Sequence, residues 1–326
     1  MCGARCDDKG RAMTTLITGA GLIGTAFAQK ALARGEGVVF FDPEPRETFI
    51  RLKLGDANVP LVRGDVRNLP DLIDAMQTHK ATTVVHTAGI IGGNVDAMMY
   101  PALQINVMGT INVAEAVRLT GVRRLVHVST FGVYDMRRDV PKIMPEDFHR
   151  GHGRAYGNSK VAKELLLEAY QAKYGFELVG VRPANVIVNG HFWSGSGGGG
   201  KVHEMVLAGI DGRPAQIPAG QTMANEYIYA KDIGGILDAA ATAPVPKQLW
   251  FNGGTGVLTS FDELVDIFKT FFPRFSYEVL PGRKGHDRDN VLDISAARAQ
   301  LGWKPAYDMK SALADYIDEV RTHGRA

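Results

Sequence analysis

Tyr156 and Lys160 are two residues whose types and spacing could together do chemistry. They lead into a helical pattern over 159–174, and side chains four residues apart share one face of a helix. A nearby cation favours phenolate over phenol, so the Lys160 ammonium would lower the pKa of the Tyr156 hydroxyl. Lowering that pKa by about three units takes roughly 4 kcal/mol, more than one lysine usually supplies. The pair therefore predicts a general base for an alcohol proton, helped by a second bound positive charge.

A second tyrosine and lysine with the same spacing, Tyr227 and Lys231, shows that spacing alone is weak evidence. This pair falls in 226–230, where the alternation of apolar and polar residues is typical of a strand. On a strand the two side chains would not converge. Taken alone, the first pair could equally be an ordinary pair on a helix surface, and the rest of the chain must decide.

A glycine-rich turn connects a predicted strand to a predicted helix near the start of the chain. The β-branched run 14–18 precedes the turn, and an apolar helical pattern follows it as far as Ala33. In this context the first glycine permits a tight turn, the second lets the backbone approach a pyrophosphate, and the third lets the helix pack on the strand. The helix N-terminus then receives the phosphate charge. The turn contains Gly19, Gly21, Leu22, Ile23 and Gly24.

Asp42 ends the second predicted strand, 37–42, and lies 18 residues after Gly24. A carboxylate at this point would accept hydrogen bonds from both ribose hydroxyls and repel a 2′-phosphate. It therefore predicts NAD rather than NADP as the cofactor. The alternative is an aspartate that only caps the loop before Pro43.

Short apolar runs and helical patterns alternate along the first two thirds of the chain. Strands are predicted at 60–66, 82–86, 124–129 and 176–181, with helices at 69–79 and 96–119. This alternation predicts an α/β fold with a doubly wound parallel sheet. A cofactor in such a sheet lies at the carboxyl ends of the strands, where Asp65, Thr87, Ala88, Gly89 and Thr130 fall. His86, also at a strand end, is expected to be a packed core residue rather than a catalyst.

Composition and charge exclude several classes of function. The chain has 326 residues, 45% of them hydrophobic and 22% charged, and its net charge of +2 predicts no binding of nucleic acid or of an acidic membrane surface. No apolar run approaches the roughly 18 residues of a membrane helix. Both cysteines, Cys2 and Cys6, precede Met13, so the body holds no disulfide framework or cysteine-rich metal site. We expect residues 1–12 to be a disordered leader and the protein to be cytoplasmic.

The motifs, taken in order, resemble those of extended short-chain dehydrogenases/reductases of the NAD-dependent epimerase/dehydratase family. The resemblance covers about Met13 to Arg321. It implies a Rossmann-type sheet, bound NAD, and a sugar or nucleotide-sugar substrate. The matching pieces are Thr18–Gly24, Asp42, Gly64–Val66, His86–Gly89, Asn106–Asn112, Val128–Tyr134, Tyr156 with Lys160, Arg182–Asn185 and Leu301–Pro305.

The resemblance also implies a role for each matched residue. Tyr156 would be the base, Lys160 would hold the nicotinamide ribose and lower the tyrosine pKa, and Thr130 would hydrogen-bond the reacting oxygen. The implied cofactor-binding residues are Gly19, Gly21, Leu22, Ile23, Gly24, Asp42, Asp65, Val66, Thr87, Ala88, Gly89, Asn106, Lys160 and Pro183. The implied substrate-binding residues are Ile90, Thr130, Asn185 and Arg283.

The implied organisation is a nucleotide-binding domain with a smaller mixed α/β substrate lobe. The domain would be 13–185 with 229–252 returning to it, and the lobe would be 186–228 and 253–326. Within the lobe, the glycine run 195–200 is expected to be a flexible linker or lid, with phosphate binding as the minority interpretation, and Ser260 with Glu263 predicts a capped helix start. The resemblance further implies that the helices at 96–119 and 159–174 pair across a two-fold axis in a homodimer.

Departures from the family pattern narrow the reaction. Dehydratases and decarboxylases of the family carry acidic residues just after the active-site threonine, where this chain has Phe131 and Gly132, so both reactions are disfavoured. An epimerase and a simple dehydrogenase need only the threonine, tyrosine and lysine and stay nearly even, while an NAD-sensing protein would be expected to lose the tyrosine or the lysine.

Two further departures concern the substrate. Many members place an arginine against the substrate diphosphate at the position of 224–225, which is Ala-Asn here. A sugar, sugar acid or other hydroxy substrate without a nucleotide therefore stays open. The glycine that follows the family's Val-Tyr pair is Asp135, which would reshape that wall of the site.

Overall fold

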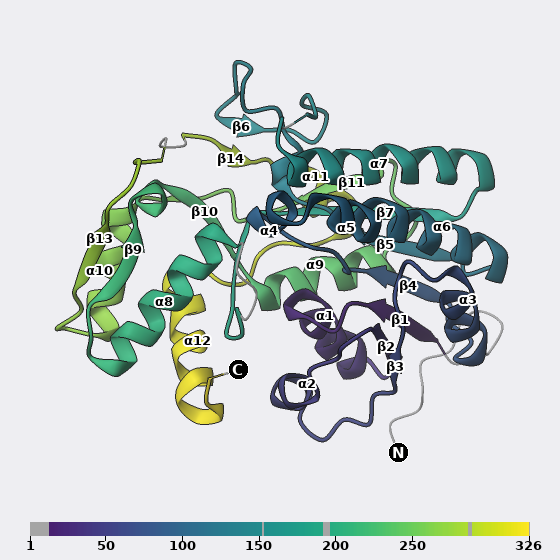
Figure 1. The fold of residues 1–326 in the computed structure, drawn as a ribbon, viewed down its shortest axis with the longest axis horizontal. Helices are drawn as coiled ribbons and strands as arrows, with labels where there is room; N and C mark the ends of the chain where they lie inside the picture. The colour runs from purple at the N-terminus through teal and green to yellow at the C-terminus, as the bar shows by residue number, and fades with distance from the viewer. Residues whose placement is uncertain (1–12, 152, 192–195, 286–288, 326) are drawn as a thin grey trace.

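A seven-stranded sheet dominates the computed structural model, which describes residues 13–151, 153–191, 196–285 and 289–325. All its neighbouring strands are parallel, in the order β11-β7-β5-β4-β1-β2-β3, and helices lie on both sides of it (Figure 1). The predicted doubly wound α/β class is confirmed. The strands are β1 (Thr14–Thr18), β2 (Gly37–Asp42), β3 (Leu61–Arg63), β4 (Thr83–His86), β5 (Arg124–Val128), β7 (Glu177–Pro183) and β11 (Trp250–Gly253).

The sheet strands are apolar throughout because both faces of the sheet are buried. Successive side chains point to opposite faces. Ile17 and Phe40 pack with α1 and α9, whereas Leu16 and Val39 pack with α3 and α6. The helices over the first face are α1 (Leu22–Ala33), α9 (Ala230–Thr242) and α11 (Ser295–Leu301), and those over the second are α3 (Leu69–Thr78), α6 (Gly109–Thr120) and α7 (Ala155–Tyr174).

The helix predicted over 96–119 is confirmed from Met99 onward, but the chain breaks at Met98 and the helix contains a π-helical turn. The structure divides this stretch into α4 (Gly93–Ala97), α5 (Met99–Leu103), the π-helix η1 (Gln104–Met108) and α6. The π-helix carries Asn106, whose side chain bonds the backbone of Ile90 through both amide atoms. The π-helix thus carries the residue that makes these two hydrogen bonds, and π-bulges are common at functional sites.

A second core holds the smaller lobe together, and three small sheets accompany it (Figure 1). The sheets pair β8 (Asn185–Ile187) with β10 (Asn225–Tyr229) and β12 (Leu258–Thr259), β9 (Ala215–Pro218) with β13 (Tyr277–Leu280), and β6 (Ile143–Met144) with β14 (Val291–Leu292). The lobe helices are α8 (Gly197–Asp211), α10 (Phe261–Phe271) and α12 (Met309–His323). The predicted capping box of Ser260 and Glu263 is confirmed at the start of α10.

The expectation of a flexible glycine linker is wrong for the described part of the run, because Gly197–Gly200 form the first turn of α8. Space rather than flexibility explains two of these glycines. A Cβ on Gly199 would lie 2.3 Å from the Val186 carbonyl oxygen, and one on Gly198 would lie 2.6 Å from Asn185 Oδ1. The helix can therefore approach β8 this closely only without side chains. Gly195 and the leader 1–12 lie outside the described residues.

The two lobes are interleaved along the chain. After the chain has built β8 to β10 of the smaller lobe, α9 packs against α1 and β11 joins the large sheet beside β7. The C-terminal helix α12 then contacts both lobes: its Glu319 forms an ion pair with Lys53 of α2 (Glu47–Leu54), and its Asp315 lies 2.6 Å from Lys231 Nζ. Across the described residues, no helix is long and apolar enough to span a membrane.

Candidate active site

The glycine turn between β1 and α1 has the geometry that a pyrophosphate site needs. Gly19 adopts a φ of +92°, and a Cβ there would lie 2.7 Å from Thr87 Oγ1. A Cβ on Gly24 would lie 2.2 Å from the Gly19 carbonyl oxygen, so the third glycine lets α1 pack on the turn. Gly21 has nothing within 4 Å of its Cβ position, which leaves its backbone open to a ligand. Leu22 and Ile23 form the first helical residues. The turn thus fits the diphosphate of NAD.

Two carboxylates follow the next strands of the sheet. Asp42 Oδ2 accepts a hydrogen bond of 2.9 Å from the Ala20 amide, which fixes this carboxylate beside the glycine turn. Asp65 is instead paired with Arg67, whose Nη2 lies 2.5 Å from Asp65 Oδ2, and this arginine lowers the pKa of Asp65. Val66 is buried against Gly109. Asp42 Oδ1 also accepts from the Glu44 amide at 2.8 Å, which is the loop cap given above as the alternative, so the ribose role of Asp42 stays a prediction.

Asn106 links the cofactor edge of the sheet to the catalytic helix. It bonds Ile90 at 2.8 and 3.0 Å, and its Nδ2 donates to Ser159 Oγ at 3.3 Å. Ser159 Oγ donates in turn to the Tyr156 carbonyl oxygen at 2.7 Å. Gly89 has no room for a side chain here, since a Cβ would lie 2.9 Å from Asn106 Oδ1. Thr87 and Ala88 complete this edge, with Thr87 Oγ1 donating to the Thr18 carbonyl oxygen at 2.8 Å.

Thr130, Tyr156 and Lys160 are brought together at the carboxyl end of β5. Thr130 lies two residues after that strand, and Tyr156 lies in the first turn of α7. The Thr130 side chain hydrogen-bonds Tyr156 and also accepts from the Gly132 amide at 3.1 Å. Lys160 is buried, and its Nζ lies 5.8 Å from the centroid of the Tyr156 ring. These three residues form a site in which one hydroxyl oxygen could be held and deprotonated.

The pKa of Tyr156 does not follow the expectation that Lys160 lowers it. Burial raises the pKa of Tyr156 to about 12, with the Thr130 hydrogen bond opposing that rise. Lys160 does not counteract it, because its Nζ donates to the Val128 carbonyl oxygen at 3.1 Å. Burial also lowers the pKa of Lys160 to about 8. The surrounding protein therefore does not ionise Tyr156, and the cationic nicotinamide is the remaining source of stabilisation for the phenolate.

A buried charge network behind this site was missed by the sequence reasoning. Glu164 accepts from Arg182 Nη2 at 2.7 Å, from Ser129 Oγ at 2.5 Å and from Arg150 Nη1 at 3.0 Å. Arg182 also donates to Tyr134 Oη at 3.0 Å. The network ties α7 to β5 and β7 and so fixes the helix that carries the tyrosine. A carboxylate four residues after Lys160, on the same helix face, was the available signal.

Lys163 is a second buried lysine on the inner face of α7. Its side chain is 1% exposed, and within the described residues its amine has no hydrogen-bond partner. His127, also fully buried, lacks a partner for either ring nitrogen among the same residues. His86 is satisfied by contrast, because Thr18 and Thr110 bond its two nitrogens at 2.6 and 2.9 Å. The prediction that His86 is a core residue is confirmed.

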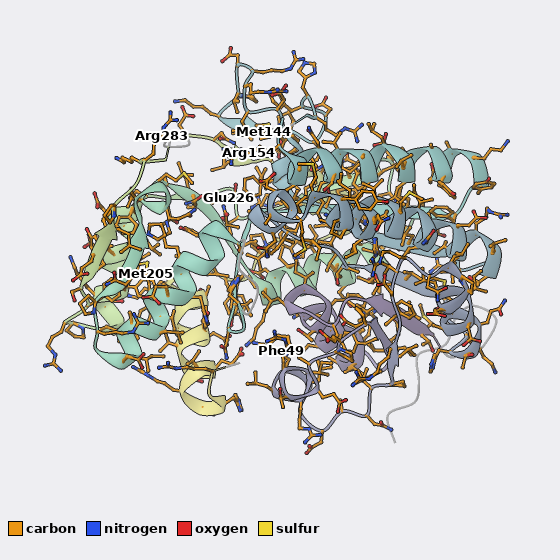
Figure 2. The ribbon with its side chains drawn as sticks, in the orientation of Figure 1. Phe49, Met144, Arg154, Met205, Glu226 and Arg283 are labelled. Carbon is orange, nitrogen blue, oxygen red and sulfur yellow. The ribbon has the colours of Figure 1, made fainter. Side chains whose placement is uncertain are left out.

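The predicted substrate residues are more dispersed. Asn185 Nδ2 donates to the Glu226 carbonyl oxygen at 3.1 Å, next to Pro183 at the end of β7. Arg283 is exposed and follows β13. In Figure 2 it lies nearer the smaller lobe than Arg154, the residue before α7, does. The substrate role of Arg283 therefore stays a prediction.

The competing pair Tyr227 and Lys231 does not converge. Tyr227 lies on β10 as predicted, and Lys231 binds Asp315 of α12 instead. The cation over the Tyr227 ring is Lys201, at 5.6 Å from its centroid. The strand interpretation of this pair is confirmed.

Comparison with known proteins gives the same family along nearly the whole chain. A UDP-glucose 4-epimerase of Mycolicibacterium smegmatis is 32% identical over 318 residues, 95% of this chain and 99% of that protein. A dTDP-glucose 4,6-dehydratase of Xanthomonas campestris is 26% identical over 338 residues, 95% of this chain and 93% of that protein. The solved structure of MoeE5 in complex with UDP-glucuronic acid and NAD is 25% identical, with a TM-score of 0.80 over 94% of this chain and 99% of that chain.

The family model that matches is that of the NAD dependent epimerase/dehydratase family, over residues 15–251. That range contains the glycine turn, Asp42, Thr130, Tyr156 and Lys160. The chain therefore belongs to the NAD-dependent epimerase/dehydratase family of enzymes.

Proposed function

We propose that this protein is an NAD-dependent sugar epimerase that acts on a sugar or nucleotide sugar. The observation that carries the proposal is the convergence of Thr130, Tyr156 and Lys160 beside the open glycine turn, with no acidic side chain in the next two positions, Phe131 and Gly132. Elimination of water needs an acid and a base beyond the tyrosine. Epimerisation needs only one base that removes a proton and returns it.

Each residue of the site has a part in this mechanism. Tyr156 takes the proton of the substrate hydroxyl, and Thr130 holds the same oxygen through its own hydroxyl. Bound NAD supplies hydride transfer to and from the sugar carbon. Lys160 holds the ribose. Burial raises the pKa of Tyr156 to about 12, so the phenolate forms only with the positive charge of the bound cofactor nearby. After the ketone has presented its other face, Tyr156 returns the proton, and the configuration at that carbon is inverted.

The alternative is a dehydrogenase that uses the same three residues and releases NADH at each turnover. The relatives support the epimerase more directly, because a UDP-glucose 4-epimerase matches at 32% identity. The match to a dTDP-glucose 4,6-dehydratase supports the shared first step, removal of hydrogen from a sugar carbon, and Phe131 and Gly132 argue against the elimination that would follow.

One experiment separates these reactions. The purified protein is denatured and the released NAD is quantified, and the native protein is incubated with UDP-glucose and with UDP-glucuronic acid while absorbance of NADH and product NMR are followed together. An epimerase releases stoichiometric NAD on denaturation and inverts the sugar without net NADH. Net NADH with an oxidised product would establish the dehydrogenase instead, and a dehydrated sugar would contradict both.

We also propose that the protein is a cytoplasmic homodimer. The support is a set of large apolar side chains exposed along the segments from α5 to α7, among them Tyr100 at 75% exposed and Leu165 at 49%. Such side chains favour an isologous interface in which the same face of each copy is buried. Light scattering at micromolar concentration should give twice the mass of the chain. Leu165→Glu should give a monomer, whereas Val245→Glu, at a position 64% exposed away from these helices, should not.

A further inference from the structure

The segment between Thr130 and Tyr156 determines how the two catalytic hydroxyls face each other. Thr130 lies two residues after β5 and Tyr156 lies in the first turn of α7, so the intervening chain must return to the same edge of the sheet. It returns through Gly151 and Gly153, which have φ values of +139° and +78°. Both glycines are held through their amides: Gly151 N–H donates to the Val133 carbonyl oxygen at 2.9 Å, and Gly153 N–H donates to Asn158 Oδ1 at 3.2 Å. Neither has a side chain that could add a further contact.

Arg137 supplies such a contact. A Cβ placed on Gly153 would lie 3.1 Å from Arg137 Nη1, and one on Gly151 would lie 3.9 Å from Arg137 Nη2. No other described residue comes within 4 Å of either position. The guanidinium therefore lies close to Gly153, two residues before the start of α7.

Asp135 holds that guanidinium in place. Its carboxylate accepts from Arg137 Nε at 2.7 Å and from Nη2 at 3.1 Å, a two-point contact that fixes the orientation of the planar group. The Asp135 amide donates to the His149 carbonyl oxygen at 2.9 Å, so the same residue also touches the returning chain.

We propose that Arg137, oriented by Asp135, is a positioning residue that fixes the start of α7 and thereby the orientation of Tyr156 toward Thr130. The inference rests on the proposed function for its kinetic consequence. The Gly153 amide bonds Asn158 Oδ1 at 3.2 Å, so displacement of Gly153 would be transmitted to the first turns of the helix. Misplacement of a general base by a fraction of an ångström is enough to slow a proton transfer by roughly tenfold.

The neighbouring Arg138 provides a matched control. It carries the same charge, its Nε lies 3.4 Å from the same Asp135 carboxylate, and its side chain is 56% exposed against 66% for Arg137. It does not come within 4 Å of either glycine position. Exposed ion pairs contribute little to stability, so neither Arg137→Ala nor Arg138→Ala should unfold the protein.

The test uses the full-length protein loaded with NAD. In Arg137→Ala, the amides of 153–158 should exchange with deuterium about tenfold faster, and kcat for epimerisation of UDP-glucose should fall about tenfold with KM changed less than twofold. Arg138→Ala should change neither quantity, and Asp135→Asn should resemble Arg137→Ala. Arg137→Lys keeps the charge but cannot make the two-point contact, so it should recover less than half of the lost kcat.

Two outcomes overturn the inference. A raised KM with unchanged kcat in Arg137→Ala would make this arginine a substrate ligand, and unchanged deuterium exchange would show that it does not brace the helix start. If the wild-type protein fails to turn over UDP-glucose, the proposed function is in question while the exchange comparison still decides whether Arg137 holds the backbone.

Discussion

Replacing Lys163 by methionine should stabilise the protein, although Lys163 lies on the same helix as Lys160, for which we propose a role at the active site. The amine is 1% exposed and has no partner within the described residues. A buried donor without a partner costs about 1–3 kcal/mol, because it loses its bonds to water and gains none in return. Methionine keeps a similar length and flexibility and has no polar hydrogen. We therefore expect Lys163→Met to raise the free energy of unfolding at pH 7 by about 1–3 kcal/mol.

The pH dependence of stability gives a second, independent signature. Burial, together with Lys160, lowers the pKa of Lys163 well below its value of 10.5 in the unfolded chain. Between the two pKa values the unfolded chain binds one more proton than the folded chain does. Stability must therefore rise with pH through that window, by up to about 1.4 kcal/mol per pH unit. Lys163→Met should lack this contribution, so its advantage over the wild type should shrink as the pH rises from 7 to 9.5.

Urea denaturation of both proteins at pH 7.0, 8.0 and 9.5 measures these quantities. Lys160 and Lys201 also have a lowered pKa and give the wild type part of the same slope, so only the difference between the two proteins is assigned to Lys163. Lys173→Met, at an exposed position of the same helix, controls for the loss of a charge from α7. A destabilised Lys163→Met, or a difference that does not depend on pH, would show that the amine has a partner in the folded protein and would refute the reasoning.

Three further predictions follow from other parts of the structure. Tyr156→Phe should preserve NAD affinity but slow single-turnover hydrogen transfer by roughly 10²–10⁴-fold, whereas Tyr227→Phe should stay near the wild-type rate; equal losses would mean that the wrong tyrosine was chosen. Calorimetry should find that NAD binds more tightly than NADP by at least about tenfold and that Asp42→Ser narrows this ratio, since a carboxylate beside a phosphate dianion is costly unless compensated. Gly199→Ala, whose Cβ would lie 2.3 Å from a carbonyl oxygen, should lower the melting temperature, whereas Gly200→Ala, with nothing within 4 Å, should raise it slightly.

The features predicted correctly from the sequence are those set by local chemistry. The turn around Gly21, the strand ending at Asp42 and the helix carrying Tyr156 follow from patterns of neighbouring residues, and the structure has all three. The helix, however, begins at Ala155 rather than at residue 159.

The features that were missed depend on partners distant in sequence. The π-helix around Asn106 follows from its bonds to Ile90, and the helical glycines follow from the nearness of β8. Lys163 was missed for a different reason. A lysine within an amphipathic pattern is read as a surface residue, and only the packing of α7 on the sheet reveals that this one faces inward.

The return of α9 and β11 to the large sheet affects how this chain can fold during synthesis and where it can be truncated. During synthesis on the ribosome, β7 has no outer neighbouring strand until residue 253 has emerged. The edge of the sheet therefore stays unpaired while residues 186–228 of the smaller lobe are synthesised. A fragment ending at residue 185 would keep that open edge and leave the face of α1 that packs on α9 uncovered. Such a fragment should aggregate rather than bind NAD. For the same reason the two lobes should melt in one transition, because neither can be completed without a segment that the chain reaches only by passing through the other.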